Sequence, residues 1–183
     1  NTAHELGHKS NKVDQAFARL AFISNGNGHF VREHNRHHHT HVSTPEDCSS
    51  ARYGETLYEF ALRDIPGALK GAWELEAARL MKKELPVVSW HNEILMNWTA
   101  SLALASMLCT WLGWGALLFI FIYKFVSFFT LTLANYIEHY GLLRGKKDNG
   151  RYESCAPKHS WNTNHWFSNL ATIHLQRHSD HHA

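Results

Sequence analysis

The chain is poor in cysteine and in net charge, and both shortages exclude classes of protein. Of its 183 residues only Cys48, Cys109 and Cys155 are cysteines, and no two of them form a CxxC pair. Such a set can build neither a disulfide framework nor a cysteine-ligated iron or zinc centre, so a reducing compartment is expected. The formal net charge of +2, with no lysine- and arginine-rich block among aromatics, argues against a nucleic-acid partner.

Charge is scarcest over one long stretch, which indicates a membrane. From Ile94 to Ile137 the only charged residue is Lys124. The stretch is too long for one span of about 20 residues and long enough for two. We therefore expect a helical hairpin, 94–112 and 116–137, with its turn at Gly113-Trp114-Gly115. The alternative is a pair of helices buried in a soluble core, but such helices rarely run this long without charges. Lys124 should either snorkel or face the bundle interior.

The residues that flank the hairpin predict its orientation. Because a hairpin returns to the side it left, the segments 1–93 and 138–183 must lie on the same side of the membrane. Basic residues flank the hairpin at Lys82, Lys83, Arg144, Lys146, Lys147 and Arg151, whereas the turn carries no charge. By the positive-inside tendency this side is the cytoplasm. The chain is thus expected to be a single partial membrane domain over 1–183.

Outside the hairpin the pattern predicts further helices, so the expected fold class is all-α. An amphipathic helix should run from Leu69 to Leu85 and pack on the surface of the domain or of the membrane. Asn25-Gly26-Asn27-Gly28 is a strong breaker that should end the helix carrying the first histidines. The segment 146–150 is turn-rich, and 160–183 is compatible with a helix.

Histidine is what the chain has in excess. Most of its 16 histidines fall in or near four short runs, which read HELGH at 4–8, EHNRHHH at 33–39, NYIEHYGL at 135–142 and LQRHSDHH at 175–182. In three of these runs the imidazoles recur three or four residues apart, the spacing with which one helix aims two rings at one point. Imidazole is a common ligand of iron, zinc and copper, and so many rings suit two metals better than one four-coordinate zinc.

Spacing selects the candidate metal ligands His4, His8, His34, His38, His39, His139, His178, His181 and His182. Nitrogen ligands fit the activation of oxygen, because thiolates near reduced oxygen species would be oxidised. Two carboxylates, Asp47 and Glu138, are expected to orient ligand imidazoles or to occupy a metal. The remaining histidines should play supporting, interfacial or solvent-facing roles, and they are His29, His37, His41, His91, His159, His165 and His174.

These runs resemble the signature motifs of the bacterial integral-membrane alkane hydroxylases, the non-haem di-iron alkane 1-monooxygenases of the fatty acid desaturase and hydroxylase superfamily. TPED at 44–47 and HSWNTNH at 159–165 extend the resemblance over nearly the whole chain. NYIEHYGL is more specific than the histidine boxes that desaturases share. The resemblance implies a fragment of a membrane bundle of roughly six helices.

The same resemblance implies an activity and its partners. The family hydroxylates the terminal methyl of n-alkanes to a primary alcohol, using dioxygen, two irons and two electrons from rubredoxin and rubredoxin reductase. It implies a multi-pass protein of the bacterial inner membrane with its site toward the cytoplasm. Carried over by position, the iron ligands are the histidines that spacing selects. One departure is His37, where the family has Gly, so His37 or His38 is the ligand, and the relation to His34 favours His38.

Three other functions compete with this one. Xylene monooxygenases, desaturases and lipid hydroxylases share the histidine boxes, and NYIEHYGL discriminates against them. HELGH also satisfies the HExxH pattern of a zinc metallopeptidase, with Glu5 as general base, but this leaves the other clusters unexplained. A metal transporter would place its ligands at mid-membrane, and the expected spans contain none.

Overall fold

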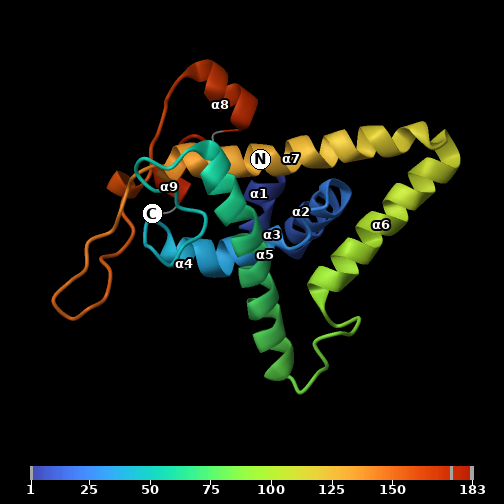
Figure 1. Ribbon diagram of the computed structural model, residues 1–183, viewed down its shortest axis with the longest axis horizontal. Helices are drawn as coiled ribbons and strands as arrows, with labels where there is room; N and C mark the ends of the chain where they lie inside the picture. Colours follow the sequence, from blue (N-terminus) through green and yellow to red (C-terminus); the bar gives the residue numbers. More distant parts are fainter. Residues whose placement is uncertain (1, 174, 182–183) are drawn as a thin grey trace. The chain divides into compact units, whose positions relative to one another are not determined.

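The computed structural model describes residues 2–173 and 175–181, and their regular structure is helical apart from one isolated antiparallel bridge between Lys146 and Tyr152. The elements in chain order are α1 (Thr2–Gly7), α2 (Lys12–Asn25), α3 (Phe30–Glu33), the π-helix η1 (His34–His38), α4 (His39–His41), α5 (Leu57–Met81), α6 (Glu93–Leu112), α7 (Gly115–His139), the 3-10 helix η2 (Pro157–His159), α8 (Trp166–Thr172) and α9 (His178–His181) (Figure 1). The all-α expectation is confirmed.

The described residues form two compact units. The first unit contains 34–68 with the segment from 132 onward, and the second contains 2–33 with 69–131. The long helices α5 and α7 contribute residues to both units. The first unit holds most of the histidines, and the second holds α6 with the larger part of α7.

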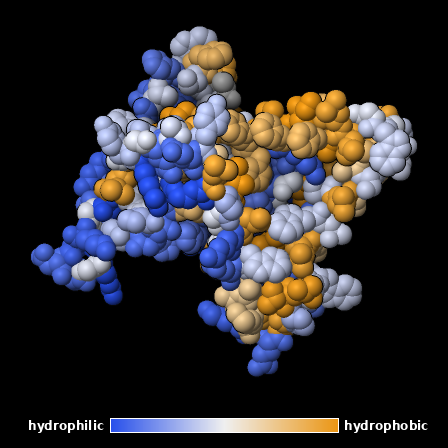
Figure 2. Space-filling view, in the orientation of Figure 1, coloured by the Kyte–Doolittle hydropathy of each residue, from blue (hydrophilic) through white to orange (hydrophobic). Residues whose placement is uncertain are grey.

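Helices α6 and α7 form the expected hairpin, and each is long and apolar enough to cross a membrane. The side chain of Asn92 begins α6 by accepting hydrogen bonds from the N–H groups of Ile94 and Leu95, at 3.0 and 3.2 Å. Gly113 follows α6 with a φ of +83°, which a glycine adopts at little cost. Most large side chains of α7 are exposed, and hydrophobic residues gather along this helix (Figure 2). Such a surface suits lipid rather than water.

Polar contacts tie the hairpin to its neighbours within the second unit. Nε of Arg19 on α2 donates to Oδ1 of Asn97 on α6 at 2.7 Å, and Nδ2 of Asn97 donates to the carbonyl oxygen of Gly28 at 2.8 Å. Between the two spans, Nζ of Lys124 donates to Oγ of Ser101 at 2.7 Å. The charge of Lys124 thus faces a polar partner on α6, one of the two arrangements expected for it.

Helix α5 differs from its expected range. It begins at Leu57 rather than Leu69, passes through Pro66, and ends at Met81. Its second half buries a charge: the carboxylate of Glu76 is inaccessible to solvent and pairs with Arg32 at 2.9 Å and with Arg79 at 2.6 Å. The amphipathic pattern of this helix therefore reflects packing on a buried ion-pair network as well as on apolar side chains.

Two other expected helices are shorter than their patterns suggest. The breaker at 25–28 ends α2, where Gly26 has a φ of +84°, but the first histidine run belongs to the separate helix α1, which ends at Gly7. In the described part of 160–183 the α-helices are α8 and α9, and Ile173 takes a left-handed conformation that ends α8. Helix compatibility along a sequence does not show where the chain turns.

Candidate metal centre

The second histidine run folds as a π-helix, His34–His38, in which one turn holds more residues than an α-helical turn. His34 and His38 are buried, and their rings stack with centroids 5.0 Å apart. The spacing argument expected this pair to aim at one point. That expectation is wrong, because the two rings belong to neighbouring clusters.

The first cluster, here called the His38 cluster, consists of His38, His139 and His178. It joins η1, the end of α7 and the start of α9 within one unit, and all three side chains are buried. One ligand nitrogen from each ring lies within 4.8 Å of the others. Nε2 of His139 and Nε2 of His178 are 3.1 Å apart.

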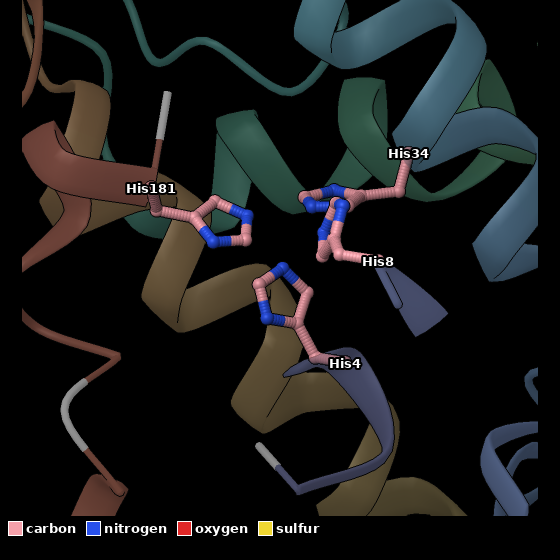
Figure 3. Close-up of side chains that lie close together, drawn as sticks. All are labelled: His4, His8, His34 and His181. Atoms are coloured by element: carbon pink, nitrogen blue, oxygen red, sulfur yellow. The ribbon is translucent and has the colours of Figure 1, made fainter. Parts of the chain in front are cut away.

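The second cluster, here called the His39 cluster, lies in the same unit and consists of His34, His39 and His181. Nε2 of His39 is 3.2 Å from Nε2 of His34 and 3.2 Å from Nε2 of His181. Figure 3 shows the rings of His34 and His181, the first from η1 and the second from α9. His178 and His181 belong to different clusters, as His34 and His38 do. The rings of His178 and His181 nevertheless stack, with centroids 5.3 Å apart.

The histidine run HELGH at 4–8 supplies a pair of imidazoles, and it belongs to the unit formed by 2–33 and 69–131. The rings of His4 and His8 meet edge to face with centroids 4.9 Å apart, and each offers a nitrogen within 4.8 Å of the other (Figure 3). Nδ1 of the buried His4 lies 3.1 Å from Oε1 of Glu5. In a zinc metallopeptidase Glu5 would be the general base. Here its carboxylate contacts the ring of His4 on the same helix.

The ring nitrogens of the His38 cluster that face outward meet oxygen atoms. Nδ1 of His38 is 2.9 Å from Oδ2 of Asp47, and Nδ1 of His178 is 3.3 Å from Oε2 of Glu138. Nδ1 of His139 is 3.3 Å from the carbonyl oxygen of His159. An oxygen on the outer nitrogen is the usual companion of a metal-binding histidine. The orienting roles predicted for Asp47 and Glu138 stay predictions, and these contacts support them.

Asp47 is held as a carboxylate. Burial raises the pKa of its carboxyl, but the neighbouring His38 and hydrogen bonds from His38, Ser50 and the N–H of Ser49 lower it further, so the pKa lies below its ordinary value. A carboxylate can only accept, and so Nδ1 of His38 carries the proton in their hydrogen bond. The carbonyl oxygen of His159 imposes the same arrangement on Nδ1 of His139.

These hydrogen bonds test whether the clusters suit a metal. With the proton on Nδ1, the neutral rings of His38 and His139 present unprotonated Nε2 atoms to their cluster. Two imidazole nitrogens bound to one metal at about 2.1 Å lie roughly 3 Å apart, and Nε2 of His139 lies 3.1 Å from Nε2 of His178. A buried set of imidazole nitrogens without thiolates suits a first-row transition metal such as iron. The residues therefore fit the predicted metal.

Several other described histidines lie outside the His38 cluster and the His39 cluster. The ring of His37 packs on that of His41, with centroids 4.7 Å apart, so the structure brings His38 rather than His37 into a cluster. His29 is buried against Trp98 and Phe128, and burial lowers its pKa to about 4. His91 and His165 are exposed. His174 and His182, the second of them a predicted ligand, lie outside the described residues.

Sequence reasoning missed contributions that come through the backbone or through small hydroxyls. The carbonyl oxygen of His159 meets His139, and the hydroxyls of Ser43 and Ser50 are hydrogen-bonded to this carbonyl and to Asp47. No residue pattern identifies a backbone acceptor. The nearest signals were the position of His159 in HSWNTNH, a motif that the family resemblance includes, and the position of Ser50 three residues after TPED.

An all-helical chain with membrane-length helices and buried imidazole clusters defines a histidine-rich metalloprotein of the membrane. The chain belongs to the fatty acid desaturase family, whose sequence profile matches residues 1–183. It is 49% identical over 183 residues to alkane 1-monooxygenase of Pseudomonas putida and 50% identical over 183 residues to alkane 1-monooxygenase 1 of Alcanivorax borkumensis. These matches cover 100% of the chain but 46% and 45% of the two relatives, so the chain spans about half their length.

A more distant relative has a different printed activity. The xylene/toluene monooxygenase hydroxylase component of Pseudomonas putida is 28% identical over 143 residues, which cover 78% of the chain and 38% of that protein. The similarity to alkane 1-monooxygenases is thus both higher and longer than the similarity to this enzyme.

Proposed function

We propose that the protein containing this chain is an alkane 1-monooxygenase, which oxidises the terminal methyl of an n-alkane to a primary alcohol. One oxygen atom of dioxygen enters the alcohol, and the other leaves as water with two protons and two electrons. The observation that carries the proposal is the pair of all-imidazole clusters, the buried His38 cluster and the half-buried His39 cluster, in a chain similar along its whole length to alkane 1-monooxygenases.

Two irons are the proposed cofactor. The His38 cluster and the His39 cluster each supply three imidazoles, and His4, His8 and His182 supply the remaining ligands. Bound iron would supply the electron-transfer chemistry that activates dioxygen. Asp47 and the carbonyl oxygen of His159 accept from the outer nitrogens of His38 and His139, which orients these two rings and keeps their Nε2 atoms unprotonated. The carboxylate of Glu138 lies beside the outer nitrogen of His178.

Rubredoxin and a rubredoxin reductase are the proposed electron donors. The chain has no CxxC pair with which to form a rubredoxin site of its own, so this segment must receive electrons from elsewhere. The proposed location is the bacterial inner membrane, with the metal centre toward the cytoplasm. The basic residues that flank the hairpin at 82–83 and 144–151 support this orientation.

The test uses the full-length protein purified in detergent. Elemental analysis should find about two irons per chain, and octane should give 1-octanol only when rubredoxin, its reductase and NADH are all present. Zinc instead of iron would contradict the proposed centre. Activity with NADH alone would contradict the external electron supply.

The second candidate is a xylene monooxygenase, favoured by the 28% identity to the xylene/toluene enzyme. It is tested with the same preparation by offering p-xylene in place of octane. Oxidation of p-xylene without oxidation of octane would replace the alkane assignment. A desaturase would instead introduce a double bond into an acyl chain, which gas chromatography of the products distinguishes from an alcohol.

A further inference from the structure

We propose that Ser43 and Ser50 are positioning residues that set the iron affinity of the His38 cluster alone. The two serines lie in the loop 42–56 between α4 and α5, Ser43 near its start and Ser50 near its middle. Both are buried, and together they reach the outer partners of two rings in this cluster. The inference rests on the proposed di-iron function and adds to it which of the two metals this loop controls.

The first arm of the loop runs to His38. Oγ of Ser50 accepts a hydrogen bond from the N–H of Ser43 at 2.7 Å and donates one to Oδ2 of Asp47 at 2.6 Å. The same Oδ2 accepts from Nδ1 of His38 at 2.9 Å. Because Ser50 fixes the carboxylate, it fixes the direction from which Asp47 accepts the proton of His38. Loss of the hydroxyl lets the carboxylate turn and the ring follow it.

The second arm runs to His139. Oγ of Ser43 donates to the carbonyl oxygen of His159 at 3.0 Å, and this oxygen is the one that lies 3.3 Å from Nδ1 of His139. The carbonyl thus has one hydroxyl donor and one imidazole donor. Ser43 connects the two arms, because its backbone N–H meets Ser50 while its side chain meets His159.

The backbone of Ser43 is strained in a way that only a well-fixed environment supports. Its φ is +57°, in the left-handed region that non-glycine residues rarely adopt, and its side chain is fully buried. The carbonyl oxygen of Ser43 accepts from the N–H of Arg144 at 2.7 Å, so all three polar groups of this residue are used. Glycine would adopt this conformation more easily but would lack the hydroxyl.

The contacts described for the two serines reach the His38 cluster and do not extend to His34, His39 or His181. Groups that hydrogen-bond a metal-binding imidazole directly typically change metal affinity by about 10- to 100-fold. The serines act through such groups, so their effect should reach about 10-fold, the lower end of this range. Removing either hydroxyl should therefore weaken one iron and spare the other.

Ser49 provides a matched control in the same loop. It is as buried as its neighbours, but its hydroxyl donates to Oδ1 of Asp64 at 2.6 Å, away from the histidines. Only its backbone N–H touches Asp47, and this group survives replacement by alanine. Ser49→Ala should thus destabilise the fold by removing this hydrogen bond to the buried Asp64, without a selective effect on iron.

The experiment compares full-length wild type with Ser43→Ala, Ser43→Gly, Ser50→Ala and Ser49→Ala, all purified in detergent. Iron affinity is measured by titrating the metal-free proteins, the two sites are followed by Mössbauer spectroscopy, and stability is measured by thermal unfolding without metal. We expect Ser43→Ala and Ser50→Ala to lose up to about 10-fold in affinity at one site and nothing at the other. Ser43→Gly should lose the same affinity while unfolding at a higher temperature than Ser43→Ala.

Three results would overturn the inference. They are two unchanged sites in Ser50→Ala, an equal loss at both sites, and an equal selective loss in Ser49→Ala. Recovery of full affinity in Ser43→Gly would show that the strained backbone, not the hydroxyl, matters. A wild type that binds no iron would instead refute the proposed function, so the two failures are distinguishable.

Discussion

At the scale of single residues, the sequence selected histidines that the structure gathers into clusters, but it did not predict which rings share a cluster. His38 and His139 could be chosen from spacing and motif, because imidazoles three or four residues apart stand out from a random distribution. That His38 shares a cluster with His139 rather than with His34 could not be predicted. The pairing depends on a π-helical turn, and a periodicity argument assumes a regular α-helix.

The choice between His37 and His38 is testable by a pair of substitutions. His38→Ala should reduce iron from about two to about one per chain and abolish alkane oxidation, because it removes a buried ring from the His38 cluster. His37→Gly should leave iron near two per chain, because its ring packs on His41. Elemental analysis of the two purified variants decides between them. The reverse result would place the ligands of this run one position earlier.

His29 predicts a dependence of stability on pH. Burial lowers its pKa to about 4 in the folded protein, whereas its unfolded value is 6.5. Between these values the unfolded chain binds more protons, so the stability that neutral His29 contributes is fully present above pH 6.5 and is lost as the pH falls toward 4. The maximum slope for one proton is about 1.4 kcal/mol per pH unit.

The measurement for His29 is the unfolding free energy of the metal-free protein and of His29→Gln between pH 7.5 and pH 4. The wild type should lose stability relative to the variant as the pH falls. Parallel curves for the two proteins would show that His29 is already solvated or charged in the fold. Its contacts with Trp98 and Phe128 argue against that outcome.

At the scale of elements, the hairpin was the easiest part of the fold to predict and the short helices were the hardest. A long stretch with a single charged residue is expected to lie in the membrane, where its backbone groups can only hydrogen-bond to one another. This requirement predicts two helices, and the structure has them between Glu93 and His139. Helices α8 and α9 have no such constraint. Their ends depend on local turns such as the one at Ile173, which no propensity of isoleucine indicates.

Lys124 and Ser101 predict a coupling between the two spans. Nζ of Lys124 donates to Oγ of Ser101 at 2.7 Å, so Ser101→Ala leaves a charged donor without this partner and should cost about 1–3 kcal/mol of stability. Lys124→Met removes the charge and the need for a partner. The double variant Lys124→Met, Ser101→Ala should therefore be more stable than Ser101→Ala alone.

A double-mutant cycle measured by unfolding in mixed micelles checks this coupling. The neighbouring hydroxyl of Thr99 serves as control, because it donates to the carbonyl oxygen of Leu95 on its own helix. Thr99→Ala should show no coupling to Lys124→Met. If the effects of Lys124→Met and Ser101→Ala on the free energy of unfolding are additive, the contact between the two spans contributes nothing to stability.

At the scale of the whole molecule, the hairpin and the distribution of charge together predict which side of the membrane each segment occupies. The turn at Gly113–Gly115 is uncharged, whereas 144–151 carries several basic residues, and cytoplasmic loops carry an excess of lysine and arginine. Trp114 should therefore face the periplasm and Lys147 the cytoplasm. Both residues are exposed, so a cysteine at either position is open to reagents.

The test labels single-cysteine variants of the full-length protein with a membrane-impermeant maleimide, after Cys48, Cys109 and Cys155 and any other native cysteines are replaced by serine. Trp114→Cys should label in spheroplasts, whose outer membrane has been removed but whose inner membrane is intact. Lys147→Cys should label only after that membrane is permeabilised. Asn149→Cys lies in the same loop but replaces a neutral residue and so keeps the charge of Lys147. It should label like Lys147→Cys if topology rather than local charge controls labelling. Labelling of Lys147→Cys in intact spheroplasts would place the histidines in the periplasm, beyond the reach of a cytoplasmic electron donor, and would contradict both the orientation and the proposed use of rubredoxin.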